Sequence, residues 1–293
     1  MFPAEKMGNR ISDARSADRP TSLLLDFAVR QRLRTYRPKQ VVLRQFDCTE
    51  HVLIVLSGWA EQAMELHDGR RQILSVALQG DLCTNDLSTG AVMDHSITAI
   101  TPLSIAIIGK LEFHSLLGCH ASLARSCWRN QMLTLSIQRR WTAIIGQMGA
   151  MERIAHLLCE SFVRQERMGL VRANVCAFPL TQHQMAEACG LTQVHTNRIV
   201  QELRKRGLID LRRRQLHINA MEELIAIAQF DPAYLNLASP EPTGTALSRK
   251  QKSNPQPAPD VSAEPPEVIP FPPRQNGGPQ TCKIERTARL GRG

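Results

Sequence analysis

Side chains suited to reading the edges of DNA bases recur at helical spacing between residues 193 and 205. Glutamine and asparagine can form paired hydrogen bonds with adenine, arginine can do so with guanine, and valine can contact the methyl group of thymine. At about 100° per residue these side chains share one arc of a helix, which we expect to enter the major groove. The arc consists of Gln193, Val194, Asn197, Arg198, Gln201, Arg204 and Lys205.

The residues before this arc predict a shorter helix followed by a tight turn. Thr181 and Gln184 have the spacing of a capping box, in which each side chain satisfies a backbone donor of the other. Gly190 permits the turn, and Thr192 can cap the second helix. Small or apolar residues on the opposite arc should pack inward, namely Thr196, Ile199 and Leu203. The pattern predicts a helix-turn-helix.

Three further residues of this motif are predicted to contact DNA. Thr181 and Gln182 lie at the start of the first helix, and His195 lies near the start of the second. The alternative for His195 is a place beside the packed face.

A basic hairpin is predicted after the second helix. Residues 208–211 and 215–218 read as short strands around Arg212, Arg213 and Arg214, which suit contacts with phosphate. Seven basic residues and two acidic ones lie between positions 198 and 214. A basic run alone is usually a solvated surface, but next to a capped helix pair it favours the wing of a winged DNA-binding domain.

The composition narrows the class of protein. The 293 residues carry a formal net charge of +9, which favours an anionic partner, and 43% of them are hydrophobic, which is enough for two modest cores. The sequence has no apolar run long enough to span a bilayer and no signal peptide, so we expect a cytoplasmic protein without a membrane partner. Its eight cysteines are scattered, and we expect most of them to be small buried residues.

Short β segments separated by turn signals fill the N-terminal half, at residues 41–43, 52–56, 59–66, 72–77, 97–99 and 104–108. Asp68 and Gly69 form a strong hairpin signal, because both residue types tolerate positive φ. These features are typical of an antiparallel β roll of jelly-roll type. With the helices that follow, the predicted fold class is α+β.

A heptad-like stripe then runs for about 25 residues and predicts one long helix. We interpret it as the interface of a homodimer, although it could instead pack on the chain's own β domain. The stripe consists of Leu123, Cys127, Asn130, Thr134, Ile137, Trp141, Ile144 and Met148.

The C-terminal region changes composition abruptly, since eleven of the chain's 17 prolines lie between positions 240 and 279. Such a segment cannot bury enough apolar surface to offset its ordering entropy, and a disordered tail is predicted. The chain thus divides into an extension (1–22), a β roll (23–118), a dimerisation helix (119–149), a winged helix-turn-helix domain (150–232) and the tail (233–293).

The order of these parts, with the text LTQHQMA at 180–186, CGLT at 189–192, NRIV at 197–200 and Leu203, resembles the Crp/Fnr family of bacterial transcription regulators. The resemblance covers about residues 23–230. It implies a cyclic-nucleotide-binding-like roll, a dimerising helix, and a homodimer on a pseudo-palindromic operator, with RNA polymerase as a candidate partner. The family's base-reading positions fall on Gln193, Val194, Asn197 and Arg198; Val194 replaces the glutamate common there.

Nucleotide-responsive members of the family carry a Gly-Glu-Leu segment and an Arg-Ser pair that grips the cyclic phosphate. The matching stretches here read Thr84-Asn85-Asp86 and His95-Ser96, without the carboxylate for the ribose or the guanidinium for the phosphate. The resemblance therefore does not extend to cyclic AMP, and the effector is unknown. No cysteine precedes Cys48, which argues against the family's iron-sulfur oxygen sensors.

Other sites are weakly indicated. The set His114, Cys119, His120 and Cys127 fits no zinc template, and we expect no metal and no cofactor. Cys83 and His95 lie where a haem or thiol sensor could sit, although ordinary packing is the simpler interpretation. No catalytic motif stands out, so an enzyme is disfavoured. A signalling module whose winged domain docks a protein remains the alternative to a DNA-binding regulator.

Overall fold

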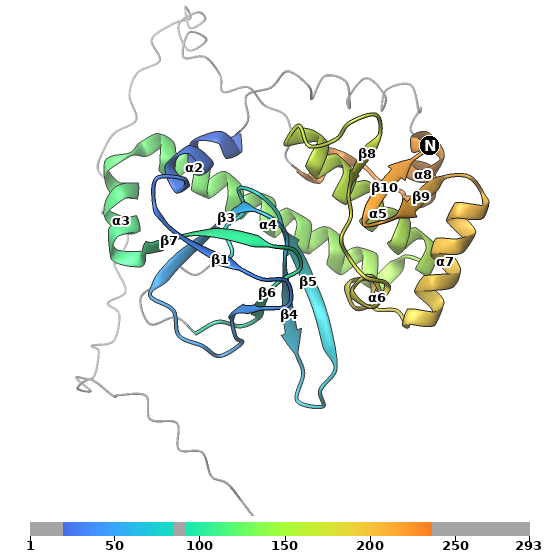
Figure 1. Ribbon diagram of the computed structural model, residues 1–293, viewed down its shortest axis with the longest axis horizontal. Coiled ribbons are helices and arrows are strands. Elements are labelled where there is room, and N and C mark those ends of the chain that lie inside the picture. Colours follow the sequence, from blue (N-terminus) through green and yellow to red (C-terminus); the bar gives the residue numbers. More distant parts are fainter. Residues whose placement is uncertain (1–19, 85–91, 236–293) are drawn as a thin grey trace, which may run out of the picture. The chain divides into compact units, whose positions relative to one another are not determined.

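The computed structural model describes residues 20–84 and 92–235 and confirms the α+β class (Figure 1). Helix α2 (Pro20–Ala28) precedes the strands of the roll. These are β1 (Arg32–Tyr36), β2 (Val41–Leu43), β3 (His51–Ser57), β4 (Ala60–Glu65), β5 (Arg71–Ala77), β6 (Ser96–Ala99) and β7 (Leu103–Gly109). They form two antiparallel sheets with the strand orders β1-β7-β3 and β2-β6-β4-β5.

Each predicted β segment overlaps an observed strand, whereas β1 was not predicted. Its sequence, Arg-Leu-Arg-Thr-Tyr, lacks the buried alternation that marks a strand, and the first four of its residues are exposed. The strand forms because β7 offers its edge from Leu103 to Ile107. The hairpin at Asp68 and Gly69 is confirmed, but only Gly69 has a positive φ, of 82°, because the loop is longer than two residues.

Helices connect the roll to the C-terminal domain. Helix α3 (Lys110–Cys119) is followed by the long α4 (Ala121–Gln147), and α5 (Ala150–Arg167) begins the winged domain. The domain continues with β8 (Val175–Ala177), α6 (Gln182–Cys189), α7 (Gln193–Lys205), β9 (Ile209–Arg212), β10 (Gln215–Ile218), α8 (Met221–Ala228) and the 3₁₀ helix η1 (Pro232–Leu235). Its small sheet has the order β8-β10-β9.

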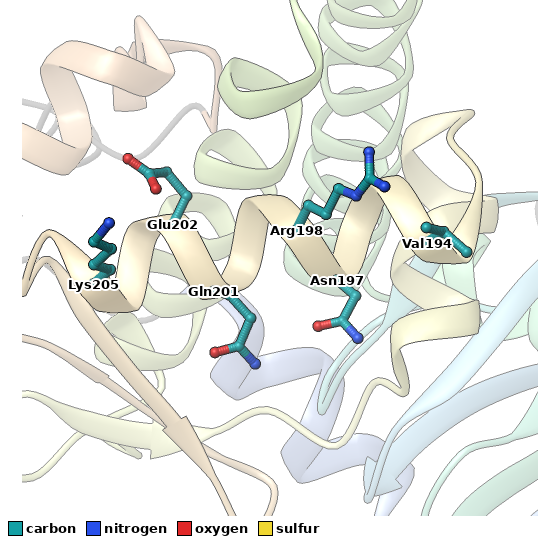
Figure 2. A pocket seen from close by; sticks show the side chains of 6 residues that line it. All are labelled: Val194, Asn197, Arg198, Gln201, Glu202 and Lys205. Carbon is teal, nitrogen blue, oxygen red and sulfur yellow. The ribbon is translucent and has the colours of Figure 1, made fainter.

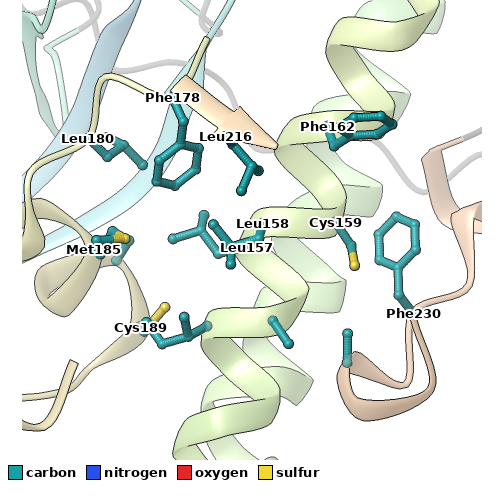
Figure 3. Packing of buried hydrophobic residues seen from close by; sticks show 14 of the residues in the cluster. Leu157, Leu158, Cys159, Phe162, Phe178, Leu180, Met185, Cys189, Leu216 and Phe230 are labelled. Atoms are coloured by element: carbon teal, nitrogen blue, oxygen red, sulfur yellow. The ribbon is translucent and has the colours of Figure 1, made fainter. Parts of the chain in front are cut away.

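Helix α5 is the centre of the C-terminal core. Eleven of its 18 residues are buried, and they include polar side chains such as His156, Glu160 and Gln165 as well as apolar ones. Figure 3 shows Leu157 and Leu158 facing the side where Met185 and Cys189 of α6 lie, while Phe230 packs on another flank of the helix. The helix-turn-helix therefore packs on a buried helix.

The roll and the winged domain share one hydrophobic cluster within the described residues. Trp59, Ala63 and Ile73 of the roll belong to the same buried cluster as α5 and α6. The rings of Trp59 and Phe178 meet edge to face, with centroids 6.4 Å apart. The roll also has two buried clusters that contain no residue of the winged domain, so the shared cluster lies where the two predicted domains meet.

The folded chain extends slightly beyond the predicted start of the tail. Residues 233–235 belong to η1, and the side chain of Leu235 is almost fully buried. The rest of the predicted tail, from residue 236, and most of the predicted extension lie outside the described residues, as does Cys282. In the part that the structure describes, no helix has both the length and the apolar composition to cross a membrane.

The cysteine prediction is confirmed for five thiols, which are buried: Cys83, Cys127, Cys159, Cys176 and Cys189. Burial raises the pKa of Cys127 to about 11 and that of Cys176 to about 12. These thiols are therefore protonated near neutral pH. Cys48 and Cys119 are exposed.

Candidate nucleic-acid interface

The predicted helix-turn-helix is present, and its turns are fixed by the predicted caps. The Thr181 hydroxyl accepts a hydrogen bond from the backbone N of Gln184 (3.2 Å), and the Gln184 side chain accepts one from the backbone N of Thr181 (2.9 Å). Gly190 adopts the left-handed conformation with φ 63°. The Thr192 hydroxyl then caps α7 by accepting from the backbone N of His195 at 3.2 Å.

Helix α7 separates a packed face from an open one, as predicted. Thr196, Ile199 and Leu203 are buried, and Val200 joins them. The open face lines a shallow groove of about 440 Å³, and Figure 2 shows its side chains projecting from successive turns of the helix. The groove is lined by Val194, Asn197, Arg198, Gln201, Glu202 and Lys205.

Two residues of this groove, Val194 and Glu202, differ from the other side chains that line it, which are amides or basic. Val194 is 65% exposed, which leaves an apolar side chain unpacked at the leading end of the helix. Glu202 was counted in the sequence only as a charge, but it also lines the groove and accepts a hydrogen bond from Arg206 at 2.9 Å. That bond lowers the pKa of Glu202. Its spacing of four residues from Arg206 could have indicated the pair.

The wing is a tight hairpin between β9 and β10, and its tip is formed by arginines. Arg213 and Arg214 have positive φ values of 49° and 62°, the conformation of a type I′ turn. For a residue with a side chain, this conformation costs roughly 1–2 kcal/mol relative to ordinary backbone. The structure records no ion pair between either arginine and another described residue, so both charges are available to a ligand.

The remaining predicted contact residues are less uniform. Asp210 pairs with Arg212 at 2.9 Å and lies 3.8 Å from Arg204, so these two arginines are partly neutralised. Thr181 and His195 are exposed, and Gln182 is half-buried. His195 does not line the groove of α7. The structure thus brings Asn197, Arg198 and Gln201 onto one surface but leaves His195 beside it.

The stripe on α4 that was predicted to face a second copy packs against the chain itself. Leu123 and Cys127 join the core of the roll, while Ile137, Trp141 and Ile144 join the cluster around α5. Asn130 is buried, with its side chain bonded to the backbone of Gly80 and Leu82. Thr134 and Met148 are half-buried. This is the alternative that the sequence left open, and it leaves the opposite face of α4 exposed.

That opposite face repeats at heptad spacing as well. Trp128 is 66% and Leu135 40% exposed, and the half-buried Met132 lies between them along the helix. Arg125 and Arg139 extend the same row toward its two ends, in steps of three and four residues.

The roll's suggested sensor residues have local partners, except that Nε2 of His95 is buried without a hydrogen-bond partner among the described residues. His95 Nδ1 lies 2.6 Å from a carboxylate oxygen of Asp94, and Thr84 accepts a hydrogen bond from the backbone N of Leu53. Burial and the charge of Asp81 raise the pKa of the Cys83 thiol above its usual range, which disfavours a reactive thiolate. Asn85 and Asp86 lie outside the described residues. No cluster of three or more metal-ligating side chains occurs among the residues described.

Comparisons with known proteins agree with both parts of the fold. The family described as "Crp-like helix-turn-helix domain" matches residues 152–227, and that described as "Cyclic nucleotide-binding domain" matches residues 33–119. The transcriptional activator protein FnrL of Cereibacter sphaeroides is 27% identical over 181 residues, which are 61% of this chain and 72% of that protein. The nitrogen fixation regulation protein FixK of Rhizobium meliloti is 27% identical over 178 residues, or 61% and 78% of the two chains.

Solved structures share the fold. The structure of FixK2 from Bradyrhizobium japonicum superposes with a TM-score of 0.60 at 24% identity, and covers 67% of this chain and 96% of that one. The c-di-GMP responsive regulator CLP of Xanthomonas campestris superposes with a TM-score of 0.55 at 17% identity, over 69% and 99% of the two chains.

Proposed function

This chain belongs to the Crp/Fnr family of transcription regulators, and from that premise we propose that it binds a two-fold symmetric operator as a homodimer in the cytoplasm. The observation that carries the proposal is the open face of α7. Its polar side chains are exposed at readout spacing on a helix whose other face is buried. A helix of this kind can enter the major groove without rearranging its own core.

The chemistry and position of each side chain decide whether it contacts bases or phosphates. Gln193, Val194, Asn197 and Arg198 lie nearest the leading end, so they read base edges, with Arg198 directed at guanine and Val194 at a thymine methyl. The other predicted residues hold the phosphate backbone and set the register. These are Thr181, Gln182, His195, Gln201, Arg204, Lys205, Arg212, Arg213 and Arg214.

The second copy of the chain packs on the exposed row of α4. Trp128, Met132 and Leu135 form a short apolar seam at heptad spacing, which suits a parallel coiled coil between two α4 helices. Neighbouring apolar side chains exposed on one surface are also typical of interaction sites. The seam lies opposite the buried stripe, so a dimer can form without disturbing the subunit core.

Sedimentation equilibrium tests the seam. Trp128→Glu should convert the dimer to a single chain of 32.8 kDa, because a buried unpaired carboxylate opposes association. The matched control is Leu111→Glu on α3, which changes another exposed leucine (73% exposed) away from α4. A Trp128→Glu protein that stays dimeric contradicts this assignment.

The roll does not take cyclic AMP in the family's manner. His95 stands where the family has the arginine that grips the phosphate, and its ring is held by Asp94. An imidazole ring lacks the two parallel N–H donors with which a guanidinium binds two oxygens of one phosphate. Calorimetric titration of the full-length protein with cyclic AMP should give no binding heat; a stoichiometric isotherm would contradict this point.

The function is tested by selecting duplexes from a random DNA pool with the full-length protein. We expect a symmetric site with half-sites about one helical turn apart. Arg198→Ala should then lose discrimination at one position of each half-site, by about 1–3 kcal/mol. Affinity should fall steeply as salt rises, because phosphate contacts release counterions. Enrichment of no duplex, or unchanged discrimination by Arg198→Ala, would contradict the assignment of α7 as the reading helix.

A further inference from the structure

A network of charged and polar side chains joins the roll to the helix-turn-helix, and none of its residues belongs to the open face of α7. Arg71, the first residue of β5, donates through Nη1 to Glu187 of α6 at 2.6 Å. Through Nη2 it donates to Glu61 of β4 at 2.5 Å. The other carboxylate oxygen of Glu61 accepts from Nε2 of Gln184 at 2.7 Å. The strands β4 and β5 therefore hold α6 at two of its residues.

This network differs from an ordinary surface ion pair. The side chains of Glu61 and Glu187 are only 7% and 13% exposed, and that of Arg71 is 29% exposed. One guanidinium thus bridges two largely buried carboxylates with charge-assisted hydrogen bonds. Removing it would leave the two acidic side chains near each other without their shared cation, an arrangement that buried charges tolerate poorly.

The same strand contacts the winged domain along its length. Gln72 Nε2 donates to the carbonyl of Ala188 at 3.3 Å, near the end of α6. At the other end of β5, Arg164 of α5 donates to the carbonyl of Val76 at 3.0 Å and pairs with Asp81 at 2.5 Å. Since α7 packs on α6, these contacts connect the reading helix to the roll through non-covalent bonds as well as through the chain.

We propose that Arg71 is a positioning residue that clamps α6 to the roll and so fixes where α7 lies in each copy of the dimer. The clamp leaves the open face of α7 uncovered, because Val194, Asn197 and Arg198 are exposed while Arg71 is engaged. It therefore sets the position of the reading helix and does not block it.

In the dimer, the clamp would fix the spacing between the two reading helices. A dimer whose helices are held at a fixed separation binds two half-sites without losing further conformational freedom. When the clamp is released, each winged domain samples a wider range of positions, and part of that freedom is lost on binding the second half-site. Contact with a single half-site needs no such alignment. This inference rests on the proposed dimeric reading of DNA.

The test uses full-length Arg71→Ala with three duplexes: the selected operator, the same operator with one base pair added between the half-sites, and a single half-site. We expect affinity for the operator to fall about 5- to 150-fold, the range of ordinary site-to-site coupling. The penalty for the altered spacing should shrink, while half-site affinity stays unchanged. Glu187→Gln, which keeps the size of the side chain, should reproduce the effect.

The matched control is Arg70→Ala, because Arg70 is the neighbouring arginine and pairs with Asp68 inside the hairpin. It should behave as the wild type. An Arg71→Ala protein that keeps operator affinity and spacing preference, or that weakens on the half-site as much as on the operator, overturns the clamp. If instead the wild type itself fails to prefer the operator over a half-site, the proposed dimeric function fails.

Discussion

The open face of α7 and the surroundings of α5 both carry polar side chains, but those around α5 have hydrogen-bond partners in the interior of the protein. Around α5 the partners are internal: Glu160 is 5% exposed and accepts from Trp141 Nε1 at 3.1 Å and from the Tyr234 hydroxyl at 2.5 Å. On α7, Asn197 and Arg198 project into solvent at the groove. Satisfied polar groups hold a structure in one arrangement, whereas exposed ones are free to recognise a ligand.

The two regions should therefore respond differently to substitution. Substitutions around α5 should alter stability and leave the preferred DNA sequence unchanged, provided that the protein is folded. Substitutions on the open face should do the opposite.

The largest effect is expected from Phe162→Ala. Phe162 is 2% exposed and lies in the cluster that supports the helix-turn-helix. Loss of a buried phenylalanine and the cavity that remains should reduce the free energy of unfolding by about 3–5 kcal/mol, as measured by urea denaturation. The control is Val194→Ala on α7, which should change stability by no more than about 0.5 kcal/mol. Equal destabilisation by both variants would contradict the distinction between the supporting core and the open face of α7.

A pH dependence should separate the two regions next. Burial, with a smaller contribution from the charge of Arg140, lowers the pKa of His156 from 6.5 to about 4. The unfolded state therefore binds a proton that the folded state resists, and stability should fall as pH drops from about 6.5 to about 4. Over the whole window, the loss from this group is about 3 kcal/mol.

Glu160 acts in the opposite sense over part of that range. Burial raises its pKa, so the folded state takes up a proton more readily than the unfolded state and partly compensates for the histidine. Urea denaturation across the window should show that His156→Gln removes the histidine's part of the slope. An unchanged slope in His156→Gln would show that another group causes the pH dependence.

The same two regions explain what the sequence could predict. The helix-turn-helix was predictable because its signals are local: a capping box at Thr181, a left-handed turn at Gly190 and a second cap at Thr192. Each is a contact between residues close in the chain. The packed face of α7 followed from helical period alone.

The face of α4 that packs on its own subunit was not predictable in the same way. Two stripes with the same period run along α4, and period cannot decide which one faces the subunit. The choice depends on distant contacts, such as the bonds of Asn130 to Gly80 and Leu82. The bridge from Arg71 to Glu187 likewise joins residues 116 positions apart. Nothing local marks either residue, so the clamp could be found only in the structure.

A smaller effect is expected at the wing. Arg213→Ala should weaken binding to all duplexes by a similar factor and reduce the slope of log affinity against log salt by about one, because a phosphate contact is lost. Arg206→Ala is the control, since Arg206 is engaged with Glu202 on the same domain. Titrations of operator and random duplex at several salt concentrations measure both quantities. A loss confined to the operator would place Arg213 at a base instead.

The smallest effect is expected from removing everything after Leu235. The proline-rich composition there offers little apolar surface to bury, so the free energy of unfolding and operator affinity should stay within error of the full chain. Removal after Asp231 should differ sharply, because it deletes Tyr234, whose ring stacks on His156, and the buried Leu235. Urea denaturation of both truncations measures this contrast. Destabilisation by the shorter deletion would show that the segment after Leu235 also contributes to the fold.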